Sequence, residues 1–157
     1  MSILKRILRR KRMQDALNMK FTMPAWAEIP DLGLYMDQVI TFTQRSYAPL
    51  YGDDATKLLT SSMVNNYVKA GLIARPVGKK YGREQLAAIL MIVQLKGVLS
   101  MDMIRLLVTG DIEACYKHFC ERQSQALCTF AISDPMQAAV ESAISALVCQ
   151  NYLKLEK

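Results

Sequence analysis

The chain has 157 residues, of which 52% are hydrophobic, and its formal net charge is +6. This length fits one globular domain or a small domain with a helical extension, and the composition excludes a disordered chain, a collagen-like chain and a disulfide scaffold. Residues 1–20 hold seven basic residues against one acidic, and residues 60–100 hold six against one, which predicts an anionic partner such as nucleic acid or a membrane surface.

The basic N-terminal tail, residues 1–20, leaves two interpretations open. It is either a solvated tail or a short amphipathic helix that binds nucleic acid or an anionic surface. Its apolar residues are interrupted by Lys5 and Arg6, so no signal peptide is predicted, and no apolar run in the chain is long enough to span a membrane. We therefore expect a cytoplasmic protein with reduced thiols.

Proline and glycine divide the next part of the chain. Residues 21–30 contain two prolines and are predicted to form an ordered strap that anchors Trp26 in the core. A helix is predicted from Asp31 to about Ser46 because its apolar residues recur at helical spacing. Residues 47–59 contain Pro49 and Gly52 and are predicted to form a loop.

The following segment carries clear helix-end signals. A helix is predicted between Thr60 as its N-cap and Gly71 at its end, followed by a small hairpin or wing over residues 75–82. Further helices are expected over residues 83–96 and from Ser100 to about residue 108.

Two longer helices are predicted in the last third of the chain, over residues 111–130 and 135–154. Asp134 would cap the second one, with Pro135 at its first helical position. Its apolar stripe fits two arrangements: packing against the chain's own body, or a homodimer built on residues 111–157.

The outer face of the helix over residues 60–71 carries the first candidate site. Polar residues recur on it at the i, i+3, i+4, i+7 positions, namely Ser62, Asn65, Asn66 and Lys69. Asparagine can make a bidentate contact with adenine in the major groove, and Ser and Lys can reach bases or phosphates. Any exposed helix face is polar, so this stripe alone has an ordinary solvated alternative.

The neighbouring basic residues favour the nucleic-acid interpretation. Glu84 is the only acidic residue over residues 60–100. A helix that enters a groove and a basic hairpin that holds the flanking phosphates would form one surface on double-stranded DNA. The residues expected to bind phosphate are Arg75, Lys79, Lys80 and Arg83.

Residues 66–73 resemble the end of the recognition helix of MerR regulators, in which an aromatic residue precedes a Gly-Leu pair. Lys79-Lys80-Tyr81 with Leu86 resembles the MerR wing. The resemblance implies a mainly α fold, a winged helix-turn-helix over residues 21–110 with a small β wing and additional C-terminal helices over residues 111–157. It also adds Tyr81 to the DNA-binding set. Ordinary MerR proteins have a tight turn in place of residues 47–59, and an arginine where this chain has Asn65.

A closer resemblance is to a bacterial family known as domain of unknown function 1836. The similar segments are residues 29–39, 59–69 and 76–81, and the likeness covers about residues 24–108. It implies a MerR-like DNA-binding fold and a role in transcription regulation. The sequence identifies neither an operator nor a small-molecule effector.

The sequence offers few residues suited to metal binding or catalysis. Cys115 and His118 share a helix face, but no CxxC pair with zinc spacing is present, so buried thiols are expected and no metal or cofactor. His118 is the only histidine, and no phosphate loop is present, so no enzyme is predicted. The alternative function is a protein-interaction module on a winged-helix scaffold without sequence-specific DNA binding.

Overall fold

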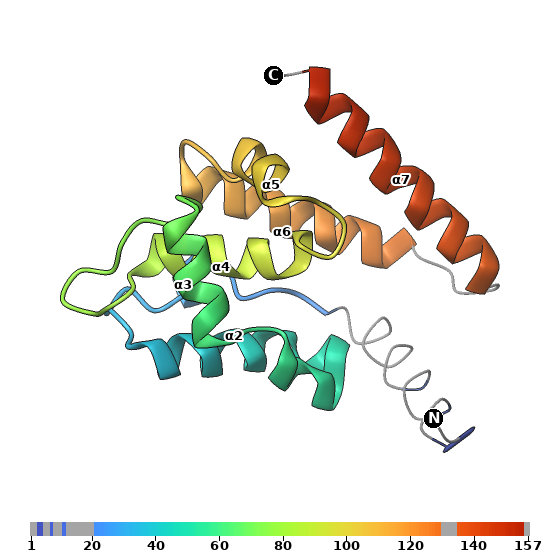
Figure 1. The fold of residues 1–157 in the computed structure, drawn as a ribbon. Helices are drawn as coiled ribbons and strands as arrows, with labels where there is room; N and C mark the ends of the chain where they lie inside the picture. The colour runs from blue at the N-terminus through green and yellow to red at the C-terminus, as the bar shows by residue number, and fades with distance from the viewer. Residues whose placement is uncertain (1–2, 5–6, 8–10, 12–20, 130–134, 156–157) are drawn as a thin grey trace.

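The computed structural model describes residues 3–4, 7, 11, 21–129 and 135–155, and this part of the chain is mainly helical and holds no β-strand. The mainly α prediction is confirmed. In chain order the elements are η1 (Trp26–Glu28), α2 (Met36–Tyr51), η2 (Gly52–Lys57), α3 (Ser61–Lys69), α4 (Arg83–Leu95), α5 (Met101–Leu107), α6 (Ile112–Thr129) and α7 (Pro135–Leu155) (Figure 1). No helix within these described ranges is both long and apolar enough to cross a membrane.

Helix α4 forms the centre of the core. Residues 86–93 are all buried, as expected for a helix that is apolar on every side. Helices α2 and α6 both pack against it (Figure 1). Tyr116 of α6 is fully buried, and its hydroxyl donates a hydrogen bond to the Pro24 carbonyl at 2.8 Å. Helix α6 therefore belongs to the same core as the segments before residue 110.

Helix α2 differs from its predicted position at both ends. It begins at Met36, where the Tyr35 amide donates to Gln38 Oε1 at 3.0 Å, and it ends at Tyr51. The predicted loop is wrong over residues 47–57, which form the end of α2 and the η2 turn, and only residues 58–59 of it are irregular. Tyr47 explains the extension: its side chain is fully buried, and its hydroxyl donates to the Leu90 carbonyl at 2.7 Å.

The N-terminal strap is ordered, but Trp26 is only half-buried. The strap is held in the core by three buried side chains, Phe21, Met23 and Ile29. The Trp26 ring instead covers the edge of the core, 6.2 Å from the ring of Tyr116 between centroids.

The two ends of α3 follow the sequence prediction. The Thr60 hydroxyl accepts a hydrogen bond from the Met63 amide at 3.3 Å. Gly71 has φ 69°, a conformation that costs glycine little, and the Leu72 amide donates to the Tyr67 carbonyl at 2.9 Å. Both predicted caps of this helix are confirmed.

Candidate nucleic-acid interface

Helix α3 presents one polar face to solvent. Val64 and Tyr67 are buried on its inner side, which fixes the rotation of the helix about its axis. The predicted contact residues on its outer side are all exposed: Ser62, Asn65, Asn66 and Lys69. The structure thus places the four helix residues of the predicted site on the exposed side of α3, opposite its buried residues.

A tight reverse turn follows α3 where the wing was predicted. Val77 and Lys80 exchange two main-chain hydrogen bonds, of 3.1 and 3.0 Å. The two residues between them have positive φ, 56° at Gly78 and 64° at Lys79, as in a type I′ turn. Lys79 is therefore a lysine in a backbone conformation that favours Gly, Asn or Asp.

A second isolated bridge joins the turn to the segment before α2. Leu34 and Tyr81 exchange two main-chain hydrogen bonds, both of 2.9 Å. The Tyr81 side chain is only 3% exposed, so its ring packs in the core rather than on the open surface. Tyr81 was predicted to bind DNA, but its side chain is part of the hydrophobic core.

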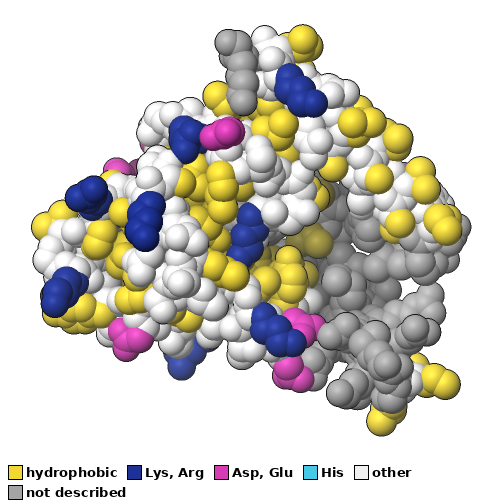
Figure 2. All heavy atoms as spheres, in the orientation of Figure 1, with side chains coloured by type: hydrophobic (Ala, Val, Ile, Leu, Met, Phe, Trp, Pro, Cys, Tyr) yellow, Lys and Arg dark blue, Asp and Glu magenta, His cyan; other side chains and the backbone are white. Residues whose placement is uncertain are grey.

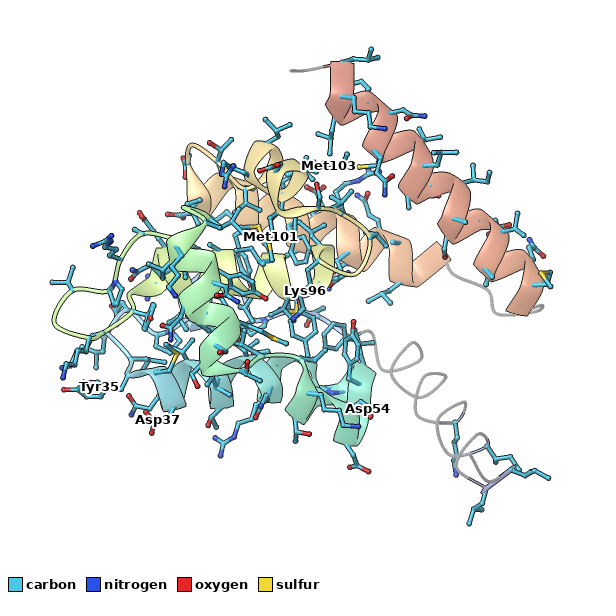
Figure 3. All side chains as sticks on the ribbon, viewed as in Figure 1. Tyr35, Asp37, Asp54, Lys96, Met101 and Met103 are labelled. Carbon is cyan, nitrogen blue, oxygen red and sulfur yellow. The ribbon has the colours of Figure 1, made fainter. Side chains whose placement is uncertain are left out.

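Lys80 packs closely on the segment that precedes α2. A Cβ atom at Gly33 would lie 2.8 Å from the Cβ atom of Lys80, so only glycine allows this approach. The Lys80 ammonium lies 5.2 Å from the centroid of the Tyr35 ring, a cation–π distance. Figure 3 shows Tyr35 near this turn, at the start of α2.

Arg83 is already engaged inside the molecule. Its Nε donates to the Ile29 carbonyl at 2.8 Å, one of its terminal nitrogens lies 3.6 Å from an oxygen of Asp31, and its guanidinium lies over the Trp26 ring. Arg83 therefore joins the strap to the start of α4, and its charge is less available to phosphate than sequence reasoning suggested.

Gln85 fixes the remaining part of the loop. Its side-chain nitrogen donates to the carbonyls of Ala74 and Arg75, at 2.8 and 3.1 Å. Its Oε1 accepts from the Gly82 amide at 2.6 Å. Sequence reasoning missed this residue, although a glutamine at the third helical position is a capping signal.

Four cations remain on the open surface. They are Lys69, Arg75, Lys79 and Lys80, and all four are exposed. No acidic residue occurs over residues 60–83. No ion pair joins any of the four to another described residue. Figure 2 shows Lys and Arg side chains distributed over the side of the molecule that carries α3 and the following loop. An anion that approaches this side meets a positive field from several directions.

The predicted cysteine and histidine positions do not form a metal site. Cys115 is half-buried, its thiol donates to the Leu107 carbonyl at 3.2 Å, and burial raises its pKa. His118 is exposed. Over residues 21–129 and 135–155, no group of three residues capable of holding a metal ion is found.

Comparison with known proteins gives one match. No curated protein and no solved structure matches the chain. A family described as "Domain of unknown function (DUF1836)" matches residues 24–126, from the strap through most of α6. The match extends beyond the segment in which the sequence resemblance was recognised and covers well over half of the 157 residues. The chain therefore belongs to the DUF1836 family.

Proposed function

We propose that this protein binds double-stranded DNA and regulates transcription, with α2 and α3 as a helix-turn-helix and the turn at residues 77–80 as a short wing. The observation that supports the proposal is the solvent exposure of both the polar α3 face and the four cations of α3 and the following loop. Acidic residues paired with these cations, or burial of the polar face of α3, would have contradicted it.

The dimensions of α3 support this assignment. An α-helix with its side chains is about 10–12 Å in diameter and fits the major groove, about 12 Å wide. The nine residues of α3 would lie along the groove over about 13 Å. Asn65 and Asn66 can each make the bidentate adenine contact, and Ser62 and Lys69 lie beside them. We assign base contacts to the asparagines and phosphate contacts to the cations of the loop.

The conformation of Lys79 is a second supporting observation. At φ 64° a lysine costs more than the glycine or asparagine that usually occupies such a turn. A strained residue with an exposed charge is better explained by contact with a ligand than by stability of the fold. Arg83 and Tyr81 support the loop from within in this proposal.

A selection from random duplex DNA at physiological salt, followed by fluorescence anisotropy on the selected duplex, tests the proposal. We expect Asn65→Ala to weaken binding of the selected sequence by about 1–3 kcal/mol while leaving binding of unrelated duplexes nearly unchanged. Lys79→Ala should weaken binding of all duplexes and lower the slope of log affinity against log salt by about one unit.

Lys57→Ala is the matched control. Lys57 is exposed and paired with Asp54 in η2, outside the proposed contact surface. The variant removes one charge of the same kind and should leave the salt slope unchanged. A full chain that selects no sequence, and whose duplex affinity is unaffected by Asn65→Ala and Lys79→Ala, would instead fit a protein-interaction module without sequence-specific DNA binding.

A further inference from the structure

The side chain of Lys96 joins the end of α4 to the start of α3. Its Nζ donates to the Leu58 carbonyl at 2.6 Å and to the thioether sulfur of Met63 at 3.4 Å. Leu58 precedes the N-cap Thr60, and Met63 lies in the first turn of α3. A thioether is a weak hydrogen-bond acceptor, so the sulfur contact contributes less to stability than the bond to the carbonyl. Its interest lies in the chemistry that an amine and a thioether can carry out together.

Both groups can be reached by a small solute. Lys96 and Met63 are half-buried, and the two residues that follow Lys96 are exposed. Burial lowers the pKa of Lys96 below its ordinary value of 10.5, so more of this group is neutral than in an exposed lysine. The neutral amine has a lone pair, which makes it a nucleophile, and it retains an N–H group that can donate to the Leu58 carbonyl.

We propose that Lys96 and Met63 form a site of covalent modification, at which a hypohalous acid converts their contact into a sulfilimine, an S=N bond between Sδ and Nζ. The acid oxidises the sulfur by two electrons, transferring its halogen to Sδ and releasing hydroxide. Nζ then attacks the sulfur and displaces halide. The nitrogen loses its two protons, one of which combines with the hydroxide to form water. One thioether, one neutral amine and one hypohalous acid thus give one sulfilimine, one halide, one proton and one water.

The distance between the two atoms favours this product over the sulfoxide. Water that attacks the same halosulfonium gives methionine sulfoxide, the ordinary product of methionine oxidation. A nucleophile held about 3–3.5 Å from the atom that it attacks can reach an effective concentration of about 10⁵ M, far above that of water. Nζ of Lys96 lies 3.4 Å from Sδ of Met63, within this range.

Two methionines of α5 provide a comparison within the same molecule. Met101 is exposed and Met103 is half-buried, and both follow Lys96 closely in the chain (Figure 3). Within the described ranges, Met63 is the methionine whose sulfur accepts a hydrogen bond from a lysine. We therefore expect the same oxidant to convert Met101 and Met103 to sulfoxides.

The bond would fix the first turn of α3 to the end of α4. It joins residues 33 positions apart in the chain and so restricts the unfolded state, as a disulfide of the same loop length does. We expect the temperature of unfolding to rise by about 10 °C. The exposed polar face of α3 is not involved, so this inference is independent of DNA binding.

Mass spectrometry of the full chain after treatment with a small molar excess of hypobromous acid tests the proposal. Trypsin does not cleave after a modified lysine, so the expected product joins residues 58–69 to residues 84–105. The crosslink should remove two hydrogen atoms from the summed mass of the two peptides, and fragmentation should place it between Met63 and Lys96. A digest in which Met63 carries only sulfoxide, or in which Lys96 is joined to another methionine, overturns the proposal.

Hydrogen peroxide is the matched oxidant. It transfers oxygen to sulfur without providing a halide for the amine to displace, so it should give Met63 sulfoxide and no crosslink. Lys96→Arg is the matched variant, because arginine keeps the charge and the N–H donors but stays protonated. With hypobromous acid this variant should form only the sulfoxide at Met63, and circular dichroism checks that it is folded. The comparison of the two oxidants on the parent chain needs no variant, and a crosslink formed equally with peroxide contradicts the halide displacement.

Discussion

The guanidinium of Arg105 donates a hydrogen bond to the main-chain carbonyl of Ala70, so helix α5 holds the C-terminal end of α3. A cation at this end of a helix is also favoured by the helix dipole. A second arm of the guanidinium lies 3.0 Å from an oxygen of Asp102. The end of α3 that carries Lys69 is therefore positioned by a residue 35 positions later in the chain.

We expect Arg105→Ala to lower the free energy of unfolding by about 1 kcal/mol, because it removes a charge-assisted hydrogen bond to a helix end. Urea unfolding measures this change. Asp102→Ala is the control, since it removes only the exposed ion pair and should cost at most about 0.5 kcal/mol. Equal losses in the two variants would show that the bond to Ala70 contributes nothing.

Gly33→Ala should destabilise the protein by about 1–3 kcal/mol, because the added Cβ would lie 2.8 Å from the Cβ of Lys80 and the turn would have to move. Thermal or urea unfolding gives the value. The bridge between Leu34 and Tyr81 should weaken at the same time, which amide hydrogen exchange of these two residues would detect.

A double-mutant cycle identifies the cause of this loss. Lys80→Gly removes the atom that a new Cβ at position 33 would meet. The cost of Gly33→Ala should therefore nearly vanish in the Lys80→Gly background. A cost that is the same in both backgrounds would mean that residue 33 destabilises the chain for another reason.

The parts of the fold that depend on a few neighbouring residues could be predicted from the sequence. Thr60 and Gly71 mark the two ends of α3, and the hydrogen bonds at these ends join residues only a few positions apart. The exposed face of α3 followed from helical periodicity alone, because Val64 and Tyr67 leave only one side free.

The features that sequence reasoning missed depend on contacts between distant residues. Helix α2 continues past its predicted end because Tyr47 reaches Leu90, 43 positions away. Arg83 was interpreted as a surface cation, but it bonds to Ile29, 54 positions away. Composition identifies a basic residue and does not tell whether its charge already has a partner inside the fold.

Lys79→Gly should separate stability from binding. Glycine adopts a φ of 64° with little strain, but it also gives the unfolded chain more conformational entropy. We therefore expect the free energy of unfolding to stay equal or rise by about 0.5 kcal/mol. DNA affinity should fall nonetheless, since the proposed phosphate contact is lost. Urea unfolding and anisotropy on the same preparation measure both quantities.

Lys80→Gly is the counterpart of this variant. It removes the same charge from a residue whose φ is not positive, and it also loses the contact with the Tyr35 ring. We therefore expect a loss of both stability and DNA affinity. If Lys79→Gly destabilises the chain as much as Lys80→Gly does, the turn conformation at residue 79 is not strained.

Two buried tyrosines should respond oppositely to the loss of their hydroxyl groups. The Tyr67 hydroxyl is buried with no hydrogen-bond partner among the described residues, so Tyr67→Phe should be neutral or raise the free energy of unfolding by about 1 kcal/mol. The Tyr47 hydroxyl donates to the Leu90 carbonyl, so Tyr47→Phe should lower the free energy of unfolding by about 1 kcal/mol. Urea unfolding at pH 7 gives both values, and a destabilised Tyr67→Phe variant would reveal a partner for this hydroxyl.

Alkaline pH should unfold the protein through its buried tyrosines. Burial raises the pKa of both Tyr47 and Tyr116 far above the ordinary value of 10.0, with smaller contributions from neighbouring Tyr51 and Cys120. Below pH 10 both states keep these protons, and the stability is fully present. Above it only the unfolded state loses them, so stability falls by about 1.4 kcal/mol per pH unit for each group. Urea midpoints measured across pH 10 should therefore decline, and the decline should be shallower in Tyr47→Phe; midpoints that stay constant would mean that these hydroxyls are not buried in solution.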